Sequence, residues 1–308
     1  MQGVSTPPRP TLKERLGSVF TWRRRNLIIA FLFVLPALIN FTLFRYLPIF
    51  AAARASVYNY SLLGGFRGFI GPSHYLRLLD DPVFWQSMWV TLQFVIVKVP
   101  LTIALALALA IFLQRESFGT GLVRSAVMAP LVTSIIVVSI IWAMMYHSEQ
   151  GLFQSILNSV GIPKQAFLSD ESRALPALTL MMIWKDVGLS FIILMAGLKG
   201  IPPVYYEAAV VDGANRWQLF RNVTVPLLRP ILMFLIVSQT VFSFQLFVPV
   251  FQMTKGGPLD STKAIVYYIY QQGFLFQDMG YASAISMITL VVLLFVSMGQ
   301  MRLLRTDY

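Results

Sequence analysis

Six long apolar runs constrain this sequence most strongly, because each has about the length that crosses a lipid bilayer. About 20 residues of α-helix, at about 1.5 Å per residue, span the roughly 30 Å hydrocarbon layer. Of the 308 residues, 57% are hydrophobic and only 12% are charged, against about 25% charged in an average soluble domain. The predicted fold is therefore an all-α, polytopic membrane protein with six transmembrane helices. We expect these helices at residues 27–44, about 88–113, about 123–146, about 175–198, about 227–253 and about 281–301.

The distribution of basic residues predicts which ends of these helices face the cytoplasm. Lys and Arg are enriched in the cytoplasmic loops of membrane proteins, and Arg23, Arg24 and Arg25 lie directly before the first apolar run. The loops near residues 114–124 and 199–229 are also basic. Both termini are therefore expected in the cytoplasm.

The expected organisation is a cytoplasmic N-terminal tail at residues 1–26, one membrane domain at 27–305 and a C-terminal tail at 306–308. The first apolar run is longer than the about 7–15 apolar residues of a cleaved signal peptide, so we expect it to remain as a transmembrane helix. Membrane lipid is accordingly an expected partner. The net charge of +11 is divided among separate segments, so nucleic-acid binding is not expected.

A polar segment between the fourth and fifth apolar runs, EAAVVDGANRWQLFRNVTVP at residues 207–226, carries strong turn and helix signals. Just before it, Pro202 and Pro203 can begin a short helix, because proline fits the first helical turn. Asp212 and Gly213 predict a turn at the end of this helix, since glycine adopts a positive φ without strain.

Beyond this turn, Asn215 is expected to cap a second short helix, and Pro226 is expected to restart the chain as the fifth transmembrane helix. The small side chains of Ala208 and Ala209 would let another protein approach closely, and Glu207 would offer a charge to a basic residue of that partner. From local physics alone, an ordinary polar loop is the alternative interpretation.

Charged side chains within the predicted helices are costly in a bilayer and are often functional. Lys98 lies in the second apolar run, and Lys185 and Asp186 lie in the fourth. In one interpretation they pair with charges on neighbouring helices, so that Lys98 neutralises a carboxylate such as Asp186. In the other, Lys98 or Asp186 lines a polar cavity and hydrogen-bonds a hydroxylated solute.

Polar and aromatic side chains supply further candidates for a solute path. In the fifth apolar run, one helix face holds Ser238 and Gln245, and a neighbouring face holds Gln239 and Ser243. Either row could contact a solute or join helices by hydrogen bonds. Trp184 could stack on a sugar ring or lie in an interfacial aromatic belt. The substrate-path candidates are Lys98, Trp184, Asp186, Ser238, Gln239, Ser243 and Gln245.

Motifs for catalysis and nucleotide binding are absent from the sequence. No Gly-Lys dipeptide occurs, so the chain has no GxxxxGK[ST] phosphate loop. Cysteine and the HExxH motif are also absent. We therefore expect no enzymatic activity, no metal site and no cofactor in this chain, and any ATP would be bound by another subunit.

An ATP-independent secondary transporter or channel for a polar solute is the alternative to an ATP-driven transporter. Secondary transporters often contain internal repeats, and no second copy of the 207–226 pattern occurs in this sequence.

The polar segment resembles the EAA signature of permease subunits of bacterial ABC importers. The matching residues are Glu207, Ala208, Ala209, Gly213, Val223, Val225 and Pro226. The family pattern has Ile and Leu where this chain has Val223 and Val225. The segments WKDVG at 184–188, LKGIP at 198–202 and TKGGP at 254–258 are similar to carbohydrate-type permeases related to the larger maltose-transporter permease. The resemblance covers about residues 27–305.

This resemblance implies an ABC importer type I permease fold in the bacterial cytoplasmic (inner) membrane and ATP-driven import of a sugar or sugar-like solute. It implies as partners a second homologous permease subunit, two ATP-binding cassette ATPase subunits that bind ATP and Mg, and an extracytoplasmic solute-binding protein. In that family the segment at 204–226 couples the permease to its ATPase. The coupling residues that it implies are Glu207, Ala208, Ala209, Asp212, Gly213 and Pro226.

Overall fold

The computed structural model describes residues 12–114 and 118–304, with side chains at 26–114 and 118–303. The chain divides into two compact units, Met1–Arg54 and Ala55–Tyr308, and each is described by itself.

The first apolar run is helical over its whole length. The elements are α1 (Leu12–Phe41), the π-helical turn η1 (Thr42–Tyr46) and α2 (Leu47–Ala55), which follow one another without a break. The stretch Asn26–Ala55 is long and apolar enough to cross a membrane. The helix thus begins inside the segment expected as a tail, and the first span extends beyond its expected end at Phe44.

The second unit is built on long apolar helices. They are α4 (Pro82–Phe112), α8 (Glu171–Lys199), α11 (Val225–Phe244) and α13 (Met279–Leu304), with the shorter α5 (Thr120–Val132) and α6 (Ile135–Met145). Among the described residues of the chain, five helices could cross a membrane, or six if α5 and α6 form one span. The predicted polytopic helical fold is confirmed.

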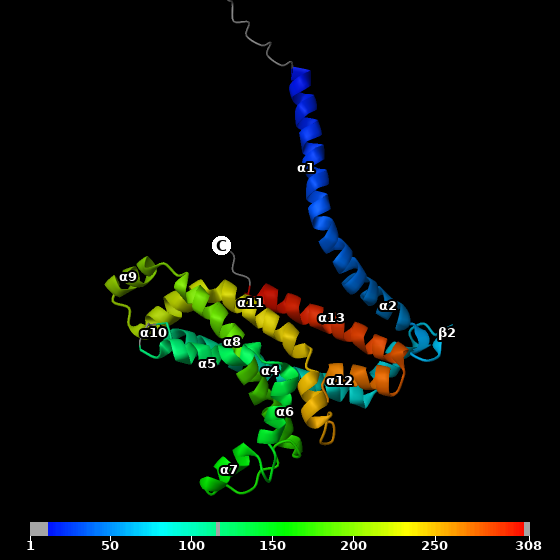
Figure 1. Cartoon of the computed structure of the whole chain (residues 1–308), viewed down its shortest axis with the longest axis vertical. Helices are drawn as coiled ribbons and strands as arrows, with labels where there is room; N and C mark the ends of the chain where they lie inside the picture. The colour runs from blue at the N-terminus through cyan, green and yellow to red at the C-terminus, as the bar shows by residue number, and fades with distance from the viewer. Residues whose placement is uncertain (1–11, 115–117, 305–308) are drawn as a thin grey trace, which may run out of the picture. The chain divides into compact units, whose positions relative to one another are not determined.

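Shorter elements lie between the long helices. They are β1 (Tyr58–Ser61), β2 (Gly65–Phe69), α3 (Ser73–Leu79), α7 (Leu152–Ser159), α9 (Pro203–Val211), α10 (Arg216–Leu219), η2 (Phe220–Thr224), η3 (Val250–Thr254), α12 (Ile265–Tyr270) and η4 (Gln271–Leu275). The strands β1 and β2 pair as an antiparallel hairpin, which was not predicted from the sequence. Figure 1 shows α9 and α10 at one end of this unit and β2 and α12 at the other.

The third predicted span is not a continuous helix, because α5 and α6 are bent by 105° relative to each other. The backbone is extended at Thr133 and Ser134. At this break, Thr133 Oγ1 donates a hydrogen bond to Pro130 O at 2.6 Å. Lys185 of α8 donates to Pro130 O and Leu131 O at 2.8 and 3.3 Å. Lys185 therefore binds the end of α5, and the charge partner expected for it is replaced by two carbonyl oxygens.

The fifth predicted span begins and ends earlier than expected. α10, η2 and α11 join into one apolar helix of 29 residues that ends at Phe244. Pro226 therefore lies inside a helix and does not restart the chain, contrary to the prediction. The π turn bonds Val225 N–H to Phe220 O, five residues earlier. This wider turn accommodates a proline, which lacks an N–H and would clash with the carbonyl four residues before it in a regular α-helix.

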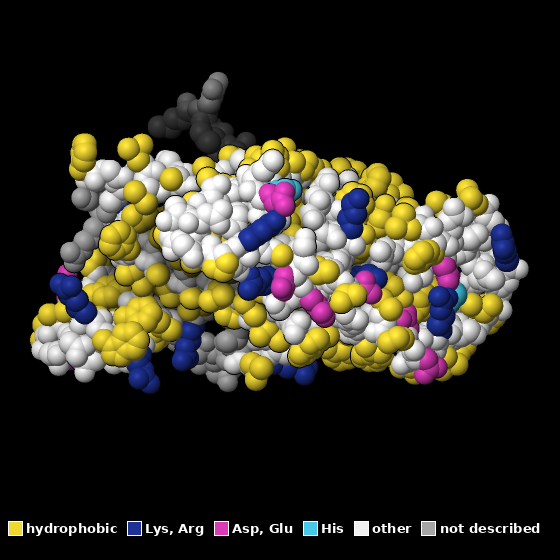
Figure 2. Space-filling model, turned by 90° about the horizontal axis from the view of Figure 1, so that it is seen from below, with side chains coloured by type: hydrophobic (Ala, Val, Ile, Leu, Met, Phe, Trp, Pro, Cys, Tyr) yellow, Lys and Arg dark blue, Asp and Glu magenta, His cyan; other side chains and the backbone are white. Residues whose placement is uncertain are grey.

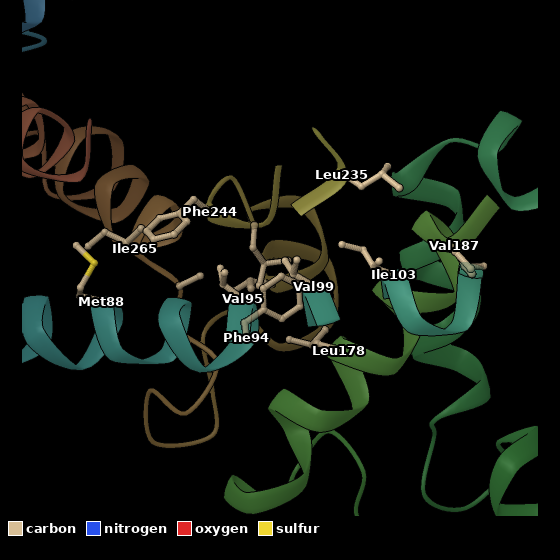
Figure 3. Packing of buried hydrophobic residues seen from close by; sticks show 14 of the residues in the cluster. Met88, Phe94, Val95, Val99, Ile103, Leu178, Val187, Leu235, Phe244 and Ile265 are labelled. Atoms are coloured by element: carbon tan, nitrogen blue, oxygen red, sulfur yellow. The ribbon is translucent and has the colours of Figure 1, made fainter. Parts of the chain in front are cut away.

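The core lies where α8, α11 and α12 pack against α4 (Figure 3). Phe94 of α4 and Leu178 of α8 are completely buried, and Leu235 of α11 is nearly so. Close packing holds such helices together in lipid, where water exclusion contributes little. Figure 2 shows hydrophobic side chains spread over one face, with basic and acidic side chains among them.

Asp81 anchors the N-terminus of α4. Its Oδ1 accepts hydrogen bonds from Val83 N and Phe84 N at 2.9 and 3.2 Å, and its Oδ2 accepts from the hydroxyls of Tyr268 and Tyr281. Burial alone would raise the pKa of Asp81, but the hydrogen bonds from the two tyrosines and the two backbone N–H groups together hold the pKa below its usual value of 3.8. The carboxylate therefore remains charged at neutral pH and joins α4, α12 and α13.

A glycine lets α8 and α5 approach closely. A Cβ atom added at Gly188 would lie 2.7 Å from Val127 O of α5, a backbone atom that cannot rotate away. Small residues at helix contacts of this kind are typical of membrane bundles.

We expect Gly188→Ala to destabilise the protein, because the added methyl group must push α5 away from α8. Overpacking of this kind costs about 1–3 kcal/mol, so the melting temperature of the purified protein in detergent should fall. Gly299→Ala in α13 is the matched control, since no atom lies within 4 Å of the Cβ added there. Equal melting temperatures for the two variants would contradict the close contact.

Candidate functional site

The polar segment forms an exposed helix, α9, at one end of the second unit (Figure 1). Pro202 occupies the N-cap position of this helix, which runs from Pro203 to Val211 and has Asp212 as its C-cap. Gly213 follows with φ +80°, and its N–H donates to Val210 O at 3.0 Å. The predicted proline start and the predicted Asp-Gly turn are both confirmed.

The surface of α9 combines small, apolar and acidic side chains. The helix has no fully buried residue. Glu207 and Ala208 are exposed and Ala209 is half-buried, while Val204 and Val211 are 60% and 87% exposed. Clustered exposed apolar side chains indicate a contact site for another molecule. The segment is therefore a helix with exposed apolar side chains and not an irregular polar loop.

Asn215 caps the helix that continues into the membrane. Its Oδ1 accepts from Gln218 N–H at 2.9 Å, and Gln218 Oε1 accepts from Asn215 N–H at 2.7 Å, which is a capping box. The predicted cap is confirmed. The second short helix predicted after it is instead the first part of the fifth span, in which Pro226 is half-buried.

Four of the substrate-path candidates form one largely buried polar cluster that joins α4, α8 and α11. Lys98 Nζ lies 2.6 Å from Asp186 Oδ2 and donates to Gln239 Oε1 at 2.6 Å. Gln239 Nε2 donates to Ser190 Oγ at 3.0 Å. Ser243 Oγ donates to Gln239 O of its own helix at 2.6 Å. Ser190 was not among the predicted residues, although its spacing of one helical turn after Asp186 places both on one face of α8.

The cluster agrees with the interpretation in which intramembrane charges pair between neighbouring helices, because Lys98 neutralises Asp186. Lys98 has no exposed side-chain surface, whereas the Asp186 side chain is 26% exposed. A buried ammonium group requires a carboxylate or other acceptors, because an unpaired charge away from water is strongly destabilising. Asp186 is thus the charged member of the cluster with surface available to another molecule.

The other candidates lie outside this hydrogen-bonded cluster. Ser238 Oγ donates to Phe234 O of its own helix at 2.7 Å. Gln245 follows the end of α11 and lines a cavity of about 150 Å³. Trp184 is 40% exposed, and its ring centroid lies 5.4 Å from that of Trp142, within an aromatic group that also contains Tyr146, Phe153 and Phe167.

A further cavity of about 880 Å³ lies along α4 and the first half of α8. Most of its lining is apolar, including Trp89, Ile96 and Leu180. The polar members are Gln93, Glu171, Ser172, Thr179 and Ser261. None of the seven substrate-path candidates lines this cavity.

Residues 98–306 match the family described as "Binding-protein-dependent transport system inner membrane component". One relative, the sulfoquinovosyl glycerol transport system permease protein SmoG of Agrobacterium fabrum, is 30% identical over 91% of each chain. Another, the trehalose/maltose transport system permease protein MalF of Thermococcus litoralis, is 32% identical over 92% of this chain and 95% of the relative.

A solved structure shares the fold. It is a chain of a bacterial alginate ABC transporter in complex with an alginate pentasaccharide-bound periplasmic protein. The TM-score is 0.79 at 24% identity, over 93% of this chain and 98% of the other. The importer permease fold expected from the EAA-like segment is confirmed.

The family match includes Lys98, Asp186, Gln239 and all of α9, and it extends over more than half of the chain. The two relatives align with nearly the whole chain. The expected inner-membrane location follows from the same match. This chain therefore belongs to the binding-protein-dependent transport system inner membrane components, the multi-pass permease subunits of ABC importers.

Proposed function

We propose that this permease forms the path for a sugar or sugar-like solute together with a second homologous permease subunit. The two relatives described above are named for trehalose/maltose and for sulfoquinovosyl glycerol, which supports a carbohydrate as the solute class. The family is named for its dependence on a binding protein. This supports an extracytoplasmic solute-binding protein as the donor of the solute.

The observation that carries the ATP-driven mechanism is the exposed helix α9, which ends at a turn that requires a positive φ at Gly213. In the proposed cycle, two ATP-binding cassette ATPase subunits bind ATP and Mg and close on each other. One ATPase holds α9 of this chain, the other holds the corresponding helix of the second permease, and their closure moves both helices. The small side chains of Ala208 and Ala209 allow close approach, and Glu207 pairs with a basic group of the ATPase. The residues proposed for this coupling are Glu207, Ala208, Ala209, Asp212, Gly213 and Pro226.

We expect Glu207→Ala and Gly213→Pro each to separate solute uptake from ATP hydrolysis while the chain still inserts into the membrane. Proline has no N–H and fixes φ near −65°, so it cannot replace a residue with φ +80° whose N–H bonds Val210 O. Loss of one hydrogen bond to a charged group costs about 1.5–3 kcal/mol, so Glu207→Ala should weaken ATPase binding about tenfold or more.

The measurement is solute uptake and ATP hydrolysis in the same proteoliposomes, which contain the complete transporter. Glu171→Ala, which removes an exposed carboxylate at the start of α8, is the control and should keep both rates. Normal uptake by both α9 variants would contradict the coupling role.

For the solute path we propose two roles among the candidate residues. Those with accessible side-chain surface are proposed to contact the solute, and they are Trp184, Asp186, Ser238 and Gln245. Those that are 0–2% exposed are Lys98, Gln239 and Ser243. Lys98 is proposed to hold Asp186 in place, Gln239 to hold Lys98, and Ser243 to support Gln239 through its bond to Gln239 O.

A single and a double variant separate these two roles. Lys98→Met leaves Asp186 without its partner, so we expect a lower melting temperature. Lys98→Met combined with Asp186→Leu removes both charges, and apolar replacement of a buried pair is often nearly neutral, so the double variant should recover most of the stability. Its KM for the solute should nevertheless rise about tenfold, because one hydrogen bond to a charged group is lost. A stable double variant with the wild-type KM would remove Asp186 from the solute path.

A further inference from the structure

One side chain of α9 points toward the membrane helices. Tyr206 is half-buried and packs against the hydrophobic core of the second unit, whereas the adjacent Glu207 is exposed. Tyr206 OH lies 3.1 Å from Thr224 Oγ1. Within the described part of the chain, this is the side-chain hydrogen bond that joins α9 to the helix of the fifth span.

Thr224 lies at a specialised position of that helix. It is 6% exposed, and it is the last residue of the π-helical turn η2. Its Oγ1 also donates to Leu219 O, five residues earlier, at 3.4 Å. The Thr224 hydroxyl therefore lies within hydrogen-bonding distance of both the Leu219 carbonyl and the Tyr206 hydroxyl. The resulting chain of hydrogen bonds runs from α9 across the π turn.

The surroundings leave room for α9 to move relative to the end of α4. A cavity of about 660 Å³ lies beside the Tyr206–Thr224 pair and is also lined by Ile111, Phe112 and Leu198. A π turn breaks the regular hydrogen-bond ladder of a helix and is frequently found at functional sites. α9 can therefore shift relative to the end of α4 without disruption of the tightly packed core.

We propose that the Tyr206–Thr224 hydrogen bond, placed on the π turn, is the joint through which displacement of α9 moves α11. Tyr206 and Thr224 are thus positioning residues for coupling, and neither needs to touch the ATPase or the solute. This inference rests on the proposed role of α9 as the ATPase contact.

The experiment compares Tyr206→Phe, Thr224→Val and the double variant in the complete transporter in proteoliposomes. Each substitution removes a hydroxyl and keeps the shape of the side chain. We expect ATPase binding to be unchanged and solute uptake per ATP hydrolysed to fall about threefold to tenfold, the factor for one lost hydrogen bond. The double variant should be no worse than Thr224→Val alone, because Tyr206→Phe removes only the Tyr206–Thr224 bond, which Thr224→Val already lacks.

Two further variants complete the test. Thr224→Ser retains the hydroxyl and should restore the wild-type ratio of uptake to ATP hydrolysis. Thr289→Val in α13 is the matched control. Among the described residues, the Thr289 hydroxyl bonds Ile285 O of its own helix at 2.8 Å, so its loss should leave the ratio unchanged.

The outcomes distinguish this inference from the proposed function. If wild-type uptake needed no ATPase, the proposed function would fail whatever the variants did. If the wild-type protein requires its ATPase but Tyr206→Phe and Thr224→Val keep the wild-type uptake per ATP, the joint is refuted. Loss of ATPase binding in these variants would also refute it, since the pair would then shape the contact surface of α9.

Discussion

Backbone N–H and C=O groups inside a bilayer must find partners within the protein, because lipid offers none. The break between α5 and α6 shows how strongly this requirement shapes the fold. α5 ends within an apolar run, and the ammonium group of Lys185 satisfies this end by hydrogen bonds to Pro130 O and Leu131 O. One turn along α8, Gly188 allows the α5 backbone to lie close enough for these bonds. The bend of 105° therefore depends on two residues of a different helix.

The same requirement explains the second intramembrane lysine. Lys98 is fully buried, and its ammonium group is held by Asp186 Oδ2 and Gln239 Oε1. Because Gln239 continues the chain of bonds to Ser190, the cluster fixes α4, α8 and α11 relative to one another. The two lysines thus differ in function: Lys185 supports a helix end, whereas Lys98 sets the position of a carboxylate that keeps some exposed surface.

α9 is attached to the fifth span in two ways, by the short loop that follows it and by the Tyr206–Thr224 bond, and the π turn η2 lies beside the second attachment. Gly213 and the capping box of Asn215 with Gln218 define the path of the chain from α9 into the fifth span. Tyr206 adds a contact that bypasses this loop and reaches Thr224 directly. Because α9 is held both by the Tyr206 side chain and by the turn at Gly213, it is suited to move as a unit. The π turn η2 is where the helix of the fifth span can change its hydrogen bonds in response.

Several features follow from short-range signals in the amino-acid sequence. The apolar runs were sufficient to predict a membrane protein with five or six spans, because the length that crosses a bilayer is a property of each run alone. They did not give the bounds of the first and fifth spans or the break in the third. The proline start of α9, the turn at Gly213 and the cap at Asn215 were predictable for a similar reason, since each depends on residues within one helical turn. The EAA-like spacing likewise indicated the permease family, because its residues lie within one continuous segment of 20 residues, Glu207 to Pro226.

Other features were decided only by the tertiary structure, because they depend on which helix faces pack together. The sequence suggested Asp186 as one possible partner of Lys98, but it gave no signal for Lys185 and the carbonyls of α5, which lie more than 50 residues apart in the chain. Pro226 was expected to restart the chain, since a local rule cannot foresee that a π turn makes room for it. The Tyr206–Thr224 bond exists because α9 folds back on the start of the fifth span, and that geometry is set by helix packing and not by the residues of either segment alone.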